Sequence, residues 1–309
     1  MKKSLVAMAA LAFAGMAAAQ SSVTLYGVAD IYVAKPKGAK VQAGSGGVAT
    51  SRWGIKGEED LGGGLKANFN YESGISLANG AVSGALFSRQ ANVGVSGGFG
   101  TIKLGKSWNA LDDIFGAANS GFDSALSANK VWLNGYAGEA VAQIYYATPS
   151  LNGFAAAVST QLNGNSASTG KTSALNVTYA QGPLAVALGY EDNKNTSLAP
   201  VQKGTMLNGS YDLGSAKLLG SYYTTKPATG ARTNSYQLGA DVPLTGALTL
   251  SVGYANSKVS GGKADSALSL AGAYSLSKRT LVYAGYRAES RKSGAADNDL
   301  WAVGINHKF

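Results

Sequence analysis

Residues 100–107 read Gly-Thr-Ile-Lys-Leu-Gly-Lys-Ser and match the whole phosphate-binding pattern G-x-x-x-x-G-K-[ST]. That chemistry needs a buried strand before the first glycine, a loop of free backbone N–H groups and a helix that begins at the lysine. Here residues 97–100 have the composition of a turn, and residues 101–104 alternate polar and apolar as a strand does. No second acidic strand for Mg²⁺ is evident. The sequence therefore predicts a strand at this position and no nucleotide site.

Other residue types that do covalent or metal chemistry are scarce. The chain has one histidine, His307, and no cysteine. A Ser/His/Asp triad would have to use His307, which by strict alternation shares the face of Trp301 and Val303 near the chain's end. Without clusters of His or Cys there is also no zinc ligand set and no disulfide. We expect no catalytic residue, no metal and no cofactor, and interpret His307 as an interfacial polar-aromatic side chain.

The remaining candidates are 26 Lys/Arg and 17 Asp/Glu side chains, spread thinly along the chain. A basic chain can bind nucleic acid, but there is no tract of clustered Lys/Arg with interleaved aromatics, so we expect no nucleic-acid partner. What scattered charges can do depends on the elements that carry them.

The N-terminus has the form of an export signal. Lys2 and Lys3 precede an apolar stretch at 5–14 and an A-x-A cleavage site, Ala17-Ala18-Ala19. The apolar stretch is far shorter than the ~20 residues of a spanning helix. We expect residues 1–19 to be a cleaved signal peptide and residues 20–309 to form one domain. Because the mature chain has no other long apolar run, it can span a membrane only as a closed barrel.

Period-2 alternation runs through the mature chain. In residues 65–72 and 248–254 apolar and polar residues alternate one by one. Such segments of about ten residues are typical of strands with one apolar and one polar face. An even number of them suits a single-chain bacterial barrel. Sixteen candidates begin near residues 23, 50, 64, 86, 100, 139, 153, 171, 184, 203, 215, 232, 247, 263, 280 and 299.

The predicted connections are short and long in turn, as in outer-membrane barrels. Short turns rich in Gly, Asn and Asp include 60–64, 97–100, 150–153, 181–183 and 212–215, and longer polar links include 35–49, 109–138, 192–202 and 290–298. The sequence thus predicts an all-β fold, a sixteen-stranded antiparallel transmembrane barrel. A soluble sandwich or propeller is disfavoured, because a single core rarely reaches this size and no linker or repeat is present. Aromatic residues near strand ends, such as Trp53, Trp108 and Trp301, suit interfacial girdles.

Several stretches resemble the general diffusion porins of Gram-negative bacteria. They are residues 20–27, the run SRWGIKGEEDLGGGLKA at 51–67, residues 89–95 and 99–105, and the closing strand at 303–309, which ends at Phe309. The resemblance covers both ends and most of the first third of the chain. It implies a homotrimer of barrels in the lipid of the outer membrane, a third long loop folded inward to narrow the pore, and Phe309 as the membrane-assembly terminus.

In such porins, arginines on the barrel wall face acids on the inward loop. Arg52 and Arg89 match positions that often belong to this cluster, and Tyr145 stands where many relatives carry another arginine. By alternation Arg52, Lys56 and Lys66 face the lumen. Strict alternation places Arg89 outward, but a charge at the lipid midplane costs ~2–4 kcal/mol. We therefore expect a bulge, or a position outside the hydrocarbon, that turns Arg89 inward.

The link 109–138 is too long for an ordinary external loop, and folding into the barrel is the commoner explanation for such length. Its acids Asp112, Asp113 and Asp123 would then face the basic wall across a narrow aqueous gap. We expect a passive, water-filled channel for small hydrophilic solutes and ions, with a modest anion preference. A substrate-specific channel and a sealed structural or adhesive barrel remain alternatives.

Overall fold

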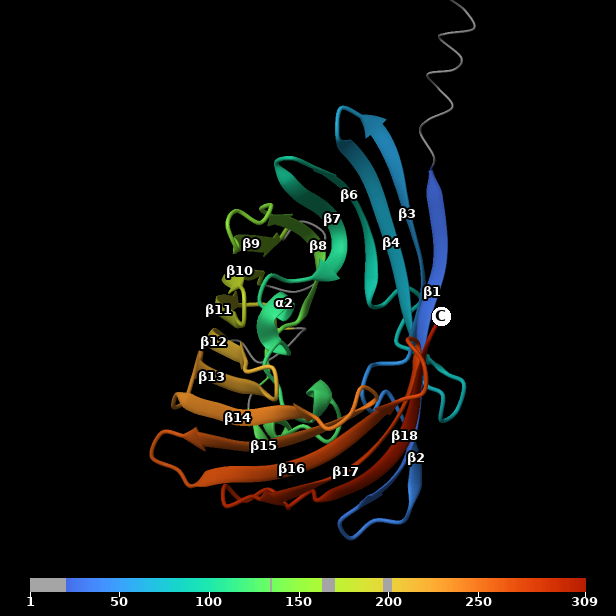
Figure 1. The fold of residues 1–309 in the computed structure, drawn as a ribbon. Helices are drawn as coiled ribbons and strands as arrows, with labels where there is room; N and C mark the ends of the chain where they lie inside the picture. Colours follow the sequence, from blue (N-terminus) through green and yellow to red (C-terminus); the bar gives the residue numbers. More distant parts are fainter. Residues whose placement is uncertain (1–20, 134, 163–169, 197–201) are drawn as a thin grey trace, which may run out of the picture.

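The strands of the chain join side by side into a closed ring (Figure 1). The computed structural model describes residues 21–133, 135–162, 170–196 and 202–309, so the predicted signal peptide lies outside the described residues. Each strand pairs antiparallel with its neighbours, and the ring closes because β1 pairs with both β18 and β3. The strands are β1 (Ser22–Pro36), β2 (Gln42–Ser45), β3 (Arg52–Gly62), β4 (Leu65–Ile75), β5 (Val82–Ser83), β6 (Gln90–Gly97), β7 (Gly100–Trp108), β8 (Glu139–Ala147), β9 (Phe154–Gln161), β10 (Thr172–Gln181), β11 (Leu184–Asn193), β12 (Gln202–Asp212), β13 (Lys217–Pro227), β14 (Thr233–Pro243), β15 (Leu248–Val259), β16 (Ala264–Ser275), β17 (Thr280–Ser290) and β18 (Leu300–Lys308).

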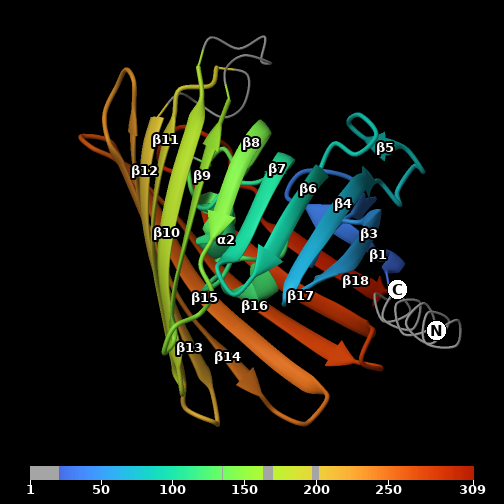
Figure 2. The ribbon, with the colours of Figure 1, turned by 90° about the horizontal axis from the view of Figure 1, so that it is seen from above.

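Sixteen long strands form the ring, because β2 and β5 are short pieces of loops. The sixteen-stranded all-β barrel predicted from the alternation is therefore confirmed. β2 lies in the predicted link 35–49, which folds back so that residues 42–45 pair with residues 31–34 of β1. Only this tertiary contact makes the segment a strand. β5 pairs with the end of β4, on a loop that projects away from the ring (Figure 2).

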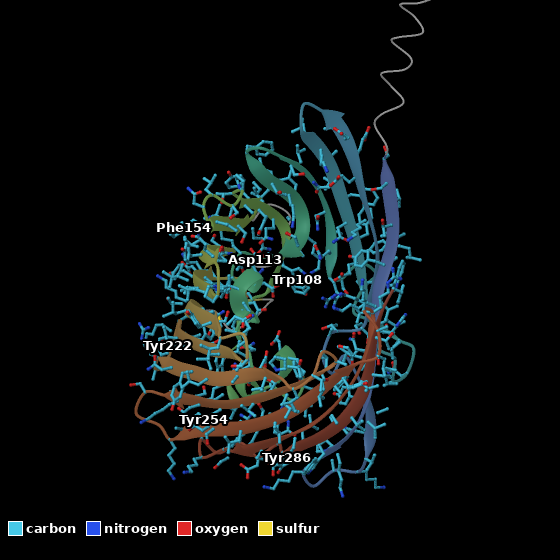
Figure 3. All side chains as sticks on the ribbon, viewed as in Figure 1. Trp108, Asp113, Phe154, Tyr222, Tyr254 and Tyr286 are labelled. Carbon is cyan, nitrogen blue, oxygen red and sulfur yellow. The ribbon has the colours of Figure 1, made fainter. Side chains whose placement is uncertain are left out.

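Side chains alternate between the two faces of the wall in the opposite sense to a soluble protein. In β15, Val252 and Tyr254 are 44% and 37% exposed, whereas Ser251 and Ser257 are completely buried. Tyr254 lies on the outside of the ring and Asp113 lies within it (Figure 3). An apolar outer face suits lipid, and a polar inner face suits water or the polar backbone of a loop.

Residues 100–107, which match the phosphate-binding pattern, lie in β7 as a strand. At Gly100, with φ of 109°, a Cβ atom would stand 2.1 Å from the carbonyl oxygen of Ala147. At Gly105, with φ of 122° beside a bulge, a Cβ atom would stand 2.4 Å from the carbonyl oxygen of Ala91. The close approach of neighbouring strands and the positive φ angles explain both glycines of the pattern.

The segment 109–138, called the inward loop below, runs inside the ring between β7 and β8 (Figure 1). It contains the short helices α2 (Asp112–Phe115), η1 (Gly121–Asp123) and η2 (Ala128–Val131). None of the helices in the described part of the chain has the length and apolar character to cross a bilayer. Helix α2 contacts β11 and β12, while η1 and η2 contact β15 and β16. Most contacts of these helices are therefore with the β11–β16 part of the barrel.

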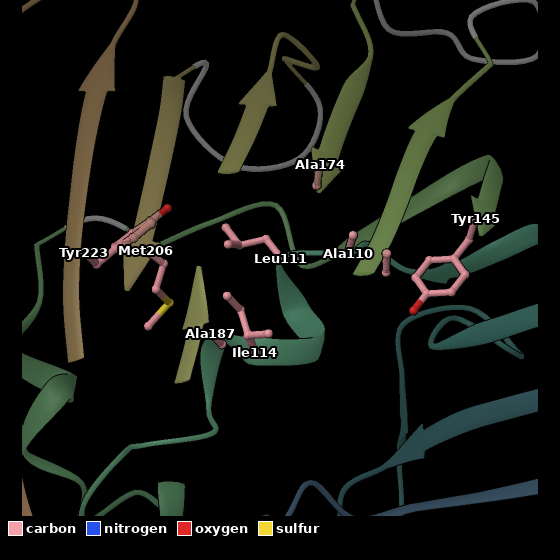
Figure 4. Packing of buried hydrophobic residues seen from close by; sticks show 9 residues of the cluster. Ala110, Leu111, Ile114, Tyr145, Ala174, Ala187, Met206 and Tyr223 are labelled. Atoms are coloured by element: carbon pink, nitrogen blue, oxygen red, sulfur yellow. The ribbon is translucent and has the colours of Figure 1, made fainter. Parts of the chain in front are cut away.

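An apolar cluster helps to seat the beginning of the inward loop (Figure 4). Leu111 and Ile114 are almost completely buried against Met206 of β12 and against alanines of β10 and β11. Phe115 stacks on Tyr136 at 3.8 Å between ring centroids, which joins the two ends of the loop. Burying Leu, Ile and Met side chains contributes roughly 1.5–3 kcal/mol each. The loop thus has a small core of its own.

Candidate pore constriction

The lumen face of β9–β17, called the anchoring wall below, holds the inward loop through buried amides and hydroxyls. Gln237 of β14 donates to the Ala118 carbonyl at 3.1 Å and accepts from the Asn129 N–H at 3.0 Å. Ser251 accepts from the Gly121 N–H at 2.7 Å, and Asn176 and Asn208 donate to loop carbonyls. These strands carry small polar residues on the inner face because their partner is a polypeptide backbone, whose groups must be bonded when buried.

The two ends of the inward loop meet at a single carboxylate. Glu191 of β11 is fully buried and accepts from the Asn109 side-chain amide at 2.7 Å and from the Ala137 N–H at 3.0 Å. Asn109 also donates from its side chain to the Ala137 carbonyl, and its N–H bonds to the Gly138 carbonyl. Because a buried charge is costly unless it is hydrogen-bonded, this arrangement fixes the loop ends to the wall.

A second anchor reaches the middle of the inward loop from the link between β2 and β3. The buried carboxylate of Asp30 accepts from the N–H groups of Gly47, Val48 and Ala49 at 2.8 to 3.0 Å. It also accepts from the Tyr283 hydroxyl and the Asn306 amide. The Gly47 carbonyl then accepts from the N–H of Ala125, whose own carbonyl is bonded by Arg287. Two loops are therefore tied together inside the ring.

The opposite side of the lumen, formed by β1, β3, β4, β6 and β7 and called the basic wall below, carries the predicted arginines. Arg52 and Arg89 both pair with Glu72 of β4, at 3.4 Å and 2.7 Å between Nε and the carboxylate oxygens. Tyr26 of β1 donates to the same carboxylate at 3.0 Å. Two guanidinium groups thus share one carboxylate, which leaves this cluster with an excess positive charge.

Arg89 turns inward because it lies at a bend just before β6 begins at Gln90. Its N–H bonds to the Glu72 carbonyl, and its guanidinium lies 4.9 Å from the ring centroid of Trp108. Trp108 and Asp113 both lie inside the ring (Figure 3). The expected place of Trp108 in an outer aromatic girdle is therefore wrong, because the strand irregularity at 105–107 changes the alternation at the end of β7. Only the tertiary fold reveals that change.

Lys56 and Lys66 lie further along the same wall toward the short turn that joins β3 and β4. The Lys56 ammonium lies 5.1 Å from the ring centroid of Tyr26, and Lys66 pairs with Glu58 at 2.5 Å. Both members of the Lys66–Glu58 pair are about half exposed, so the pair contributes little to stability. Lys56 and Lys66 are consequently not in the Arg52–Arg89 cluster, although the alternation correctly places them on its face of the sheet.

The three predicted loop acids make bonds within the loop or to the wall behind it. Asp112 accepts from the Tyr136 hydroxyl, and Asp123 accepts from the Asn119 amide at 2.8 Å. Asp113 accepts from Tyr145 at 2.7 Å and from Asn176 at 3.1 Å. In the described part of the chain, no ion pair within 4.0 Å joins these acids to Arg52 or Arg89. The predicted pairing of loop acids with these arginines is therefore not a direct ion pair.

Among the loop acids, Asp112 has the most perturbed acidity. Burial is the largest cause and raises its pKa to about 6. The negative charge of Asp113 also raises this pKa, whereas the Tyr136 hydrogen bond and the positive charge of Arg89 lower it. Burial together with the charge and hydrogen bond of Asp112 raises the pKa of Tyr136, so this hydroxyl stays protonated. Asp112 therefore changes charge in the neutral to mildly acidic range.

A polar cavity of about 600 Å³ opens between the tied loops and the wall. Its lining includes Asp123 and Lys130 of the inward loop, Arg287 of β17 and the backbone of residues 46–50. No group of three or more possible metal-ligating side chains occurs within the residues that the structure describes. The cavity is thus lined by charged and polar groups of both loops and the wall.

Sequence reasoning missed several of these residues. Alternation in residues 65–72 places Glu72 on the same face as Lys66, but nothing in the sequence shows that it pairs with two arginines. Asp30 and Glu191 carry no sequence signal beyond an acid at an inward position.

The chain ends against the first strand of the barrel: the backbone of Phe309 exchanges two hydrogen bonds with Gly27 of β1, each 3.1 Å long.

Comparisons with known proteins agree with this geometry. The model of the family described as Gram-negative porin matches residues 5–305. Outer membrane porin protein 32 of Delftia acidovorans is 36% identical, over 99% of this chain and 94% of that protein. The solved structure titled anion-selective porin from Comamonas acidovorans superposes with a TM-score of 0.83 at 29% identity, covering 94% of this chain and all of that one. The trimer form of OmpT, an outer membrane protein of Vibrio cholerae, shares the fold with a TM-score of 0.72 at 18% identity, over 94% of this chain and 99% of that one.

Proposed function

Because the chain belongs to the Gram-negative porin family, we propose that its channel passes small hydrophilic solutes and ions with a modest preference for anions. The protein is an outer-membrane porin, a channel and not an enzyme. Solutes cross passively, down their own gradients. Selectivity comes from the width of the passage and the charges that line it.

One observation carries the anion preference: Arg52 and Arg89 share the single carboxylate of Glu72. A surplus of positive charge on the basic wall attracts anions over a distance of about one Debye length, ~8 Å in physiological salt. Asp112 opposes this field by less than a full charge at neutral pH, because burial raises its pKa to about 6. The similarity to a solved anion-selective porin also supports a preference for anions over cations.

The inward loop is proposed as the constriction, with Asp112, Asp113 and Asp123 on one side and Arg52 and Arg89 on the other. Lys56 and Lys66 then extend the positive side away from the narrowest section, and Tyr145 supports the loop by its bond to Asp113. Resistance concentrates where the passage is narrowest, so charges there dominate selectivity.

Single-channel recording in a lipid bilayer tests the proposal. Stepwise currents, and a reversal potential in a KCl gradient that shows chloride crossing more readily than potassium, are the expected results. Clear cation selectivity in dilute KCl would overturn the anion preference. Saturable block by one solute would support a substrate-specific channel instead, and absence of current would support a sealed barrel.

We also propose that the channel is a homotrimer surrounded by outer-membrane lipid, and that Phe309 ends the strand that membrane assembly requires. The trimer form of a structural neighbour supports the oligomer. In mild detergent an unheated sample should migrate as a folded oligomer and a boiled one as a monomer. Light scattering that gives a monomer mass in mild detergent would contradict the trimer.

A further inference from the structure

Lys103 of β7 lies on the basic wall at the edge of the inward loop. Its neighbours Ile102 and Leu104 are 40% and 50% exposed on the outer face, so Lys103 points into the lumen. In the β7–β8 register it lies directly opposite Tyr145. The ammonium lies 4.9 Å from the centroid of the Tyr145 ring, whose hydroxyl is bonded to Asp113 of the loop.

The charge of Lys103 is more available than those of its basic neighbours. Arg52 and Arg89 share Glu72, Lys66 pairs with Glu58, and Lys106 pairs with Glu139 at 3.2 Å. Within the described ranges, Lys103 has no carboxylate partner within 4.0 Å. The nearby acid, Asp113, is already bonded by the Tyr145 hydroxyl and the Asn176 amide. Lys103 therefore supplies a positive charge that no acid neutralises by contact.

The ring of Tyr145 holds the Lys103 side chain without using up its hydrogen-bond donors. An ammonium is attracted to an aromatic face, but the face is not a strong hydrogen-bond acceptor, so its three N–H groups can still bond to an anion. Lys56 is held over Tyr26 in a similar way, but Tyr26 donates to Asn70 and Glu72 rather than to the loop. Of these two lysines, Lys103 is thus the one connected to the loop.

We propose that Lys103 binds permeating anions of the carboxylate and phosphate class beside the inward loop and is a principal determinant of the anion preference. This inference rests on the proposed function and adds Lys103 to the Arg52–Arg89 cluster as a second source of the anion preference. At the Arg52–Arg89–Glu72 cluster an anion meets positive charges that one carboxylate partly offsets, whereas at Lys103 it meets an ammonium with no carboxylate in contact. The bond is to a compact charge and carries little geometric specificity.

The test compares Lys103→Gln with Lys278→Gln in planar bilayers, using KCl, potassium acetate and potassium phosphate gradients. Lys278 is exposed at the short turn between β16 and β17, so its loss removes the same charge far from the inward loop. The Lys103 variant should lose about half or more of the anion-to-cation permeability ratio, and its conductance should rise more linearly with salt. The Lys278 variant should match the parent. Lys103→Arg should keep the preference, because it keeps the charge.

The chain has no cysteine, so Lys103→Cys offers a second measurement on an assembled channel. A positively charged thiol reagent should restore the anion preference, and a negatively charged one should reduce it further. If Lys103→Gln retains the parental selectivity, or if both reagents act alike, the inference is wrong while the proposed function stands. A parent channel that prefers cations would instead overturn the proposed function itself.

Discussion

The two sides of the lumen use polar residues in different ways. On the anchoring wall, Gln237, Ser251 and Glu191 are fully buried and bonded to the backbone or amide groups of the inward loop. On the basic wall, Lys56 and Lys66 are exposed, and the basic residues pair with acids on neighbouring strands or lie over aromatic rings. Both walls present the same alternating pattern in the sequence.

This difference separates residues that hold the inward loop, on the anchoring wall, from residues that can contact solutes, on the basic wall. A buried amide on the anchoring wall loses its partner when it is changed, and the loop moves with it. Lys56 and Lys66 on the basic wall are exposed, so removing either charge should alter the field in the channel and leave the packing intact. Variants of the two walls should therefore affect different measurements.

The largest effect should follow from removing the centre of the inward loop, residues 118–127. Widening the narrowest section should raise single-channel conductance about twofold. Shortening the projecting β5 loop by residues 78–81 is the control and should leave conductance unchanged. The loop would prove to be external if the first deletion had no effect and thiol labels at positions 113 and 123 reacted only from outside without blocking current.

Removing one carboxylate from each wall compares how much the two walls contribute to the free energy of unfolding. Glu191→Ala leaves the Asn109 amide and the Ala137 N–H without their acceptor, and should lower the free energy of unfolding by about 3 kcal/mol. Glu58→Ala breaks an exposed ion pair with Lys66 and should cost less than about 1 kcal/mol. Denaturant titration of the folded barrel measures both. Equal losses would mean that burial does not distinguish the two walls.

For variants of the basic wall, the informative result is whether the anion-to-cation permeability ratio rises or falls. Glu72→Gln removes the carboxylate that Arg52 and Arg89 share, so both guanidinium groups become unneutralised. The anion-to-cation permeability ratio should increase about twofold at 0.1 M salt. Arg52→Ala should shift it in the opposite direction, with little loss of folded protein. An unchanged ratio with Glu72→Gln would show that these charges lie outside the conducting path.

The smallest expected effect is a pH dependence from Asp112. Its pKa of about 6 means that the side chain is charged at pH 8 and mostly neutral at pH 5. Loss of this negative charge should increase the anion preference as the pH falls, by less than about 1.5-fold because the wall charges remain. Asp112→Asn should remove the change between pH 8 and pH 5. An unchanged titration in that variant would assign the effect to another group.

Much of the fold and part of the constriction could be predicted from the sequence. Alternation identifies the sixteen strands and places Arg52, Lys56 and Lys66 on the inner face, because a strand has only two faces. The pairing of Glu72 with two arginines and the roles of Asp30 and Glu191 as anchors could not be predicted. Each depends on residues that only the closed ring brings close together. Trp108 was misplaced because one irregularity in β7 reverses the faces beyond it.

The attachments of the inward loop also decide how the channel responds to voltage. Most of an applied potential falls across the narrowest section, and moving one full charge through 100 mV releases about 2.3 kcal/mol. A single bond to a charged group is worth ~1.5–3 kcal/mol, and the loop is held at both ends by Glu191 and along its length by Gln237 and Arg287. Loop acids moving through a fraction of that potential gain too little energy to break these bonds together. We therefore expect the loop to stay in place at moderate potentials, so that the current remains proportional to the voltage.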